Sequence, residues 1–162
     1  KTIFMEMNYL AILVAAASSF VVGFIWYNPK VFGTIWMNEI GMTEEKASQA
    51  NMAKVFGLSF VFAFMLAFML PTIVIHQIGA AQLAGGNAND PALISFLEVH
   101  GDMFRTFQHG ALHGFLAALF FVLPVLAING LYEQKSFKYI FVTSGYWMVT
   151  LTIMGAIICG WK

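Results

Sequence analysis

Residues 107–128 read FQHGALHGFLAALFFVLPVLAI and contain no Asp, Glu, Lys or Arg. An α-helix needs about 20 apolar residues to cross the hydrocarbon core of a bilayer, so this stretch is long enough to span a membrane. Three further uncharged stretches are of similar length, at residues 9–27, 55–75 and 139–161. The sequence therefore predicts an all-α, integral membrane four-helix bundle, with residues 1–162 forming a single membrane domain.

The composition supports a membrane protein and excludes several other classes. Hydrophobic residues make up 60% of the 162 residues and charged residues only 10%, whereas roughly a quarter of a soluble domain is charged. Eight Lys and Arg balance eight Asp and Glu, so the chain lacks the basic surface that nucleic acid selects. We expect the lipid bilayer to be its main partner and expect no nucleic acid. Cys159 is the only cysteine, which excludes a disulfide framework within one chain.

The distribution of positive charge predicts the orientation of the spans. An even number of spans places both termini and the loop between spans two and three on one side. Five positive residues fall on the opposite side: Lys30, Lys46, Lys54, Lys135 and Lys138. Three fall on the side of the termini: Lys1, Arg105 and Lys162. Cytoplasmic loops carry the excess of Lys and Arg, so we expect a multi-pass protein of a bacterial inner membrane whose termini and second loop are periplasmic.

The first two loops are expected to contain short interfacial helices. In residues 31–40, four apolar side chains share one helical face by i, i+3, i+4 spacing: Phe32, Ile35, Trp36 and Ile40. Residues 91–100 form the second candidate, because Asp90 is a suitable N-cap and Pro91 suits the first helical position. Both helices are predicted to lie at the membrane surface.

Small residues indicate where the helices pack closely. Helices in lipid associate through close approach of small side chains, since lipid tails are as apolar as the helices. One ridge recurs every four residues along the first span, and shorter ridges occur in the third and fourth spans. The residues are Ala11, Ala15, Ser19 and Gly23, then Gly110 with Gly114, and Ala156 with Gly160. These ridges predict a tight bundle and suggest a face for a dimer.

The four histidines are the residues most able to carry chemistry. His76, His100, His109 and His113 all fall between the end of span two and the second turn of span three. His109 and His113 are spaced i, i+4, which places both imidazoles on one helical face as a metal site needs.

We predict that a metal would be held by His109 and His113, with His100, Asp102 or Glu98 completing the shell. Imidazole and carboxylate ligands suit Zn, Cu or Fe. His76 facing His109 or His113 from a neighbouring helix would instead suit a haem with two axial imidazoles. Structural roles at the water interface are the favoured interpretation for all four, and a proton relay or contact with a ligand is a further alternative.

Three stretches carry a family resemblance. They are Trp26, Tyr27, Asn28 and Pro29 followed by Phe32, Gly33 and Trp36; then residues 110–114; then Gly145, Tyr146 and Trp147 with residues 154–157. The chain resembles the bacterial membrane proteins grouped as domain of unknown function 1761. That resemblance implies four spans and no assigned activity, and of the histidines only His113 lies within these stretches.

The leading interpretation is a non-enzymatic protein that acts as a homo-oligomeric module or as a small subunit of an envelope complex. Packing residues are plentiful, and the sequence contains no GxSxG, Walker, HExxH or CxxC motif. The first alternative is a membrane enzyme that binds a metal or haem through its histidines. The second is a transporter or channel for small solutes, although spans two and four carry few polar groups at mid-depth.

Overall fold

The computed structural model describes residues 7–162, and those residues form helices and connecting turns with no strand. Lys1, which entered the charge count, lies outside the described residues. The elements in chain order are α1 (Tyr9–Trp26), α2 (Gly33–Ile40), α3 (Glu44–Ser48), α4 (Met52–Met69), α5 (Pro71–Val74), α6 (His76–Leu83), α7 (Pro91–His100), α8 (Phe107–Ala117), η1 (Ala118–Val122), α9 (Leu123–Tyr132) and α10 (Phe137–Gly160). The predicted all-α fold is confirmed.

Four helical segments are long and apolar enough to cross a membrane, which makes the chain a multi-pass membrane protein. They cover Tyr9–Trp26, Met52–Val74, Phe107–Tyr132 and Phe137–Gly160. The second segment combines α4 with the single turn α5, and Pro71 stands at the first position of that turn. Proline lacks the N–H that would continue the helix, so α4 is interrupted directly before Pro71.

The third span continues to Tyr132 through a π-helical turn. That turn, η1, covers Ala118–Val122 and leads directly into α9, whose second residue is Pro124. A proline inside a helix removes one hydrogen bond and its ring crowds the carbonyl four residues earlier. A wider turn beside the proline lets the chain stay helical through this region. The span ends at Tyr132, beyond the expected boundary at residue 128.

The small ridge of the first span packs inside the bundle. Ala11, Ala15 and Ser19 are buried, and α1 contacts both α4 and α10. The hydroxyl of Tyr146 on α10 donates to the carbonyl of Ser19 over 3.2 Å, and a side chain at Gly23 would meet the Tyr146 ring at 3.6 Å. The ridge is therefore covered within the chain and is not left for a second copy.

The closest helix contact joins α8 to α10 through glycines. A Cβ atom at Gly110 would lie 2.1 Å from the carbonyl oxygen of Gly155, and one at Gly114 would lie 2.0 Å from that of Leu151. Gly155 therefore faces both α8 glycines, whereas Ala156 of the predicted ridge is only half-buried. Gly160 lies against the ring of Phe107 at the end of the same interface.

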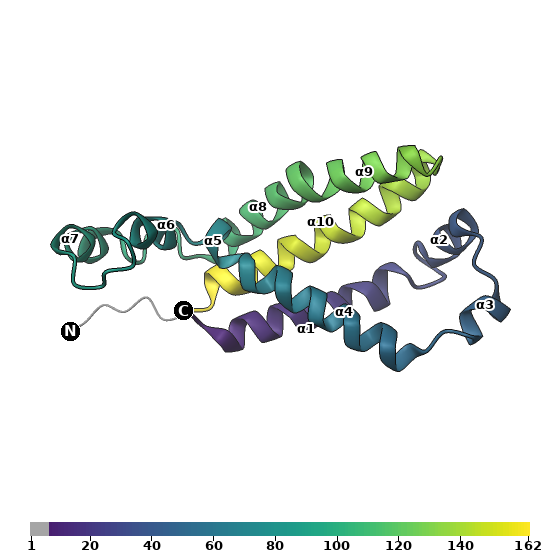
Figure 1. Cartoon of the computed structure of the whole chain (residues 1–162), viewed down its shortest axis with the longest axis horizontal. Helices are drawn as coiled ribbons and strands as arrows, with labels where there is room; N and C mark the ends of the chain where they lie inside the picture. Colours follow the sequence, from purple (N-terminus) through teal and green to yellow (C-terminus); the bar gives the residue numbers. More distant parts are fainter. Residues whose placement is uncertain (1–6) are drawn as a thin grey trace.

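The two ends of the bundle carry different connections (Figure 1). At one end, α2 and α3 link the first two spans. Glu39 of α2 contacts Ser136, which caps α10, and Lys138, which lies in the first turn of α10. At the other end, α6 and α7 extend beyond the spans, on the same side as the C-terminus. Helices are present at both predicted loop positions, and Asp90 caps α7 as expected by accepting from the backbone of Ala92 and Leu93. The placement of these helices at the membrane surface stays a prediction.

Candidate metal centre

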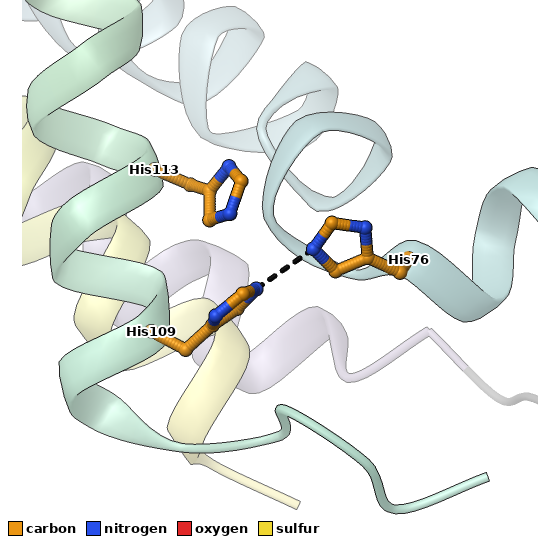
Figure 2. A group of neighbouring side chains, drawn as sticks. All are labelled: His76, His109 and His113. Atoms are coloured by element: carbon orange, nitrogen blue, oxygen red, sulfur yellow. Dashed lines mark hydrogen bonds between the residues drawn. The ribbon is translucent and has the colours of Figure 1, made fainter. Parts of the chain in front are cut away.

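Three histidines from two helices meet at the end of the bundle that carries α6 and α7. His76 is the first residue of α6, while His109 and His113 lie on α8, and all three rings turn toward one common space (Figure 2). One ligand nitrogen from each ring can be chosen so that all lie within 4.8 Å of one another. The Nε2 atoms of His76 and His109 are 2.8 Å apart. The geometry is that of a three-imidazole site.

The sequence HGALHG at residues 109–114 explains how α8 supplies two of these rings. Gly110 and Gly114 lie against the backbone of α10, which fixes the rotation of α8 about its own axis. Each histidine precedes one of these glycines, and a step of one residue turns a helix by about 100°. His109 and His113 therefore share the face beside the α10 contact, and their ring centroids are 4.4 Å apart.

The break after the second span supplies the third ring. The turn α5 packs against α8, and Ile75 then adopts an extended conformation that ends the span. The buried thiol of Cys159 on α10 donates to the carbonyl of Val74 over 3.2 Å, just before this break. His76 directly follows Ile75, and the centroid of its ring lies 5.0 Å from that of the His113 ring.

Phe104 forms an aromatic wall beside the three histidines. Its ring stacks on His109 with centroids 5.0 Å apart and lies edge-on to His76 at 6.0 Å. Its backbone has a φ of 63°, which is rare for a bulky residue because the Cβ atom crowds the neighbouring carbonyl. The sulfur of Cys159 lies 3.3 Å from the Phe104 carbonyl, to which its single S–H can donate in place of the bond to Val74.

Gln77 fixes the start of α6 relative to the segment that leads into α8. Its side chain is buried, and its Nε2 atom donates to the carbonyls of His100 at 2.7 Å and Met103 at 2.8 Å. Because Gln77 follows His76 directly, these two hydrogen bonds also fix the position of the His76 backbone. The site thus depends on the start of α6, on α8, and on the segment before α8 to which Gln77 is hydrogen-bonded.

The contact between His76 and His109 determines which chemistry the site allows. Two imidazole nitrogens at hydrogen-bond distance require that one carries a proton and the other offers a lone pair. A tetrahedral ion with Zn–N bonds of 2.0–2.1 Å would hold its ligand nitrogens about 3.4 Å apart. The His76 and His109 nitrogens, 2.8 Å apart, would therefore separate slightly, and any pair farther apart, up to the limit of 4.8 Å, would approach. A haem would need the two nitrogens on opposite faces of a planar macrocycle, whereas these rings touch directly. The geometry favours a single ion over a haem.

The family comparison agrees with the motifs found in the sequence. A family model described as "Protein of unknown function (DUF1761)" matches residues 10–159. The chain belongs to the DUF1761 family. No curated protein and no solved structure matches it.

The motifs associated with DUF1761 gather at two places in the structure. At the end of the bundle that carries α2, Trp26 donates to the carbonyl of Val142 over 3.0 Å, and its ring covers Gly145. Tyr27 packs between Trp36 and Tyr146, with both ring distances at 5.2 Å. At the opposite end, residues 110–114 form the close contact with α10 and carry His113. The first group stabilises the fold, and the second also positions the histidines.

The structure brings together two of the five residues named from the sequence for a metal site. His109 and His113 lie together, whereas His100, Asp102 and Glu98 are not members of the three-histidine group. The His100 ring packs against Phe96 at 5.0 Å, and Asp102 forms an ion pair with Lys162 at 3.0 Å. His76 takes the third place. The sequence had suggested it only as an axial haem ligand, and its position depends on the break that follows Val74.

Proposed function

We propose that this DUF1761 protein binds a divalent transition-metal ion through His76, His109 and His113. The observation that carries the proposal is the convergence of one nitrogen from each ring within 4.8 Å. Three converging imidazoles present nitrogen lone pairs to one common space, which is the donor arrangement that a transition-metal ion uses. A bound ion would satisfy three lone pairs at once.

The ligand set favours zinc and related ions. Neutral imidazoles suit Zn, Cu, Fe and Ni, whereas Mg and Ca prefer oxygen ligands, and the group contains no carboxylate. Three histidines also leave a tetrahedral ion one ligand short. That arrangement is typical of zinc sites whose ion reacts or exchanges ligands, while purely structural sites use four protein ligands.

The charge distribution supports a location on the periplasmic side of a bacterial inner membrane. Lys30, Lys46, Lys54, Lys135 and Lys138 lie in or beside the connections at the far end from the histidines. If that end is cytoplasmic, as the positive-inside rule favours, the metal site faces the periplasm.

Assembly into a homo-oligomer or into an envelope complex is the second candidate role. Only 17% of the most apolar window of the third span is buried within the chain, against 39% for the fourth. The third span therefore offers a large surface to lipid or to another protein. Mass measurement of the purified protein in mild detergent tests this role: a defined oligomer or a retained partner supports it, and a monomer without partners contradicts it.

Metal analysis of the purified full chain tests the metal proposal. The protein is incubated with zinc, freed of unbound ion, and analysed for zinc per chain. We expect one zinc per chain for the wild type and for His100→Ala, which alters the histidine outside the group. A variant with His109→Ala and His113→Ala should retain almost none. Equal zinc in that variant and in the wild type would contradict the proposal.

A further inference from the structure

The three histidines leave one coordination position of a tetrahedral ion to be filled from outside the group. Zinc is almost always bound by four ligands in proteins, or by three together with water or substrate. Among residues 7–162, the only His, Cys, Asp or Glu side chains that converge at this point are His76, His109 and His113. The chain therefore supplies three ligands.

Two other candidate ligands near this end of the bundle are engaged elsewhere. Asp102 pairs with Lys162, with its carboxylate 3.0 Å from the ammonium group. The thiol of Cys159 is fully buried and lies within hydrogen-bond distance of the carbonyls of Val74 and Phe104, and its single S–H proton serves one of them at a time. Neither group can turn to the ion without breaking contacts that hold α5 and the segment before α8.

The charge of the site favours an anion in the fourth position. Three neutral imidazoles do not reduce the charge of a divalent ion, and no carboxylate belongs to the group. The bound ion would therefore be the largest local charge. No ligand carboxylate would offset its attraction for anions, although solvent would screen it. A carboxylate or small inorganic anion would neutralise part of this charge, whereas a neutral ligand would not.

The approach to this position is from water. His76 is exposed and lies just beyond the second span, while His109 and His113 are partly exposed in the first two turns of the third. Phe104 covers one side by stacking on His109. A ligand would therefore enter past His76, at the end of the bundle, and not from the hydrocarbon core.

We propose that the metal ion binds a small anionic ligand from the aqueous side as its fourth ligand, in exchange for water. This proposal rests on the proposed function, because the anion binds to the metal. It adds the ligand class of the site, namely carboxylates and small inorganic anions. The exchange breaks one metal–oxygen bond to water and forms one bond to the anion, without a redox step.

Cobalt(II) spectroscopy of the full chain in detergent tests the proposal. Cobalt replaces zinc at imidazole sites and absorbs visible light according to its ligands. Azide and acetate are added to the cobalt-loaded protein, with acetamide as an uncharged analogue of acetate. We expect azide and acetate to change the visible spectrum saturably with one anion per cobalt, and acetamide to leave it unchanged. His100→Ala should respond like the wild type.

The outcomes separate the two proposals. If cobalt binds at the three histidines but neither anion alters the spectrum, the fourth position is closed and this inference is wrong while the metal site stands. If acetamide acts as well as acetate, charge does not select the ligand and the inference is also wrong. An anion response that persists in the variant with His109→Ala and His113→Ala would place the responding cobalt elsewhere and overturn it. If cobalt and zinc both fail to bind the wild type, both proposals fall.

Discussion

The Nε2 atoms of His76 and His109 lie 2.8 Å apart although 33 positions separate the residues in the chain. Two features produce this contact. The glycines of α8 fix the rotation of that helix against α10, and the extended residue Ile75 after Val74 places His76 beside α8. The same backbone contacts that hold the bundle together therefore also bring the imidazoles together.

Loss of any one of the three imidazoles should weaken metal binding strongly. We expect His76→Ala, His109→Ala and His113→Ala each to reduce zinc affinity by more than about 10-fold, since even changes to outer-shell partners cost that much. Competition with a chromophoric chelator measures the affinity. His100→Ala is the matched control and should bind as the wild type does. A loss in His100→Ala equal to that in His76→Ala would contradict the assignment of the third ligand.

A methyl group at Gly110 should destabilise the bundle and disturb the site. Its Cβ atom would lie 2.1 Å from the Gly155 carbonyl oxygen, so the two backbones must separate. We expect Gly110→Ala to lower the stability by about 1–3 kcal/mol, as overpacking does. Gly57→Ala in α4 is the control, because nothing lies within 4 Å of its Cβ position and alanine favours the helix. Thermal unfolding in detergent compares the two, and equal stability would show that the α8–α10 contact is looser than described.

The Phe104→Gly variant of the protein should be more stable than the Phe104→Ala variant. Both substitutions remove the ring, but only glycine adopts a φ of 63° without strain. The difference between Phe104→Gly and Phe104→Ala should be about 1–2 kcal/mol, the cost of the left-handed conformation. Both variants should also lose part of the zinc affinity, since the stacked ring no longer holds His109.

Gln134 provides the control for Phe104. Its φ is 55°, and it lies in the turn between α9 and α10 at the opposite end of the bundle. Gln134→Gly should exceed Gln134→Ala in stability by a similar amount, with zinc affinity unchanged in both. If the Phe104 pair shows no difference in stability while the Gln134 pair does, Phe104 is not strained.

Cysteine labelling tests the orientation of the protein in its membrane. Cys159→Ala provides a background without the buried thiol. A cysteine placed at Asn87, between α6 and α7, should react with membrane-impermeant reagents applied from outside the inner membrane. A cysteine placed at Lys135 should react only with permeant reagents. The reverse pattern would place the histidines on the cytoplasmic side.

The fold was largely predictable because length and the absence of charge dominate the behaviour of membrane spans. Their exact ends were not, since Pro71 and the π-helical turn before Pro124 adjust the helices in ways that composition does not reveal. Gly110 and Gly114 were found by their spacing, but the spacing in the fourth span indicated Ala156 and Gly160 and missed Gly155, which lies opposite the two α8 glycines.

The candidate site was predictable only in the part that is local in sequence. The i, i+4 spacing places His109 and His113 on one face of any helix. The position of His76 depends on tertiary contacts of Val74 and Gln77, which no short pattern encodes. His100 packs on Phe96 one turn earlier in the same helix, and its separation from the three-histidine group depends on how α7 folds against α6.

An anomalous difference map of the zinc-loaded protein, measured at the zinc absorption edge, tests the central claim most directly. We predict one peak surrounded by a nitrogen atom from each of His76, His109 and His113, with Zn–N distances of about 2.0–2.1 Å and a fourth, non-protein ligand facing water. A map with no peak between these three rings, or with zinc bound instead at His100 and Asp102, would contradict the account.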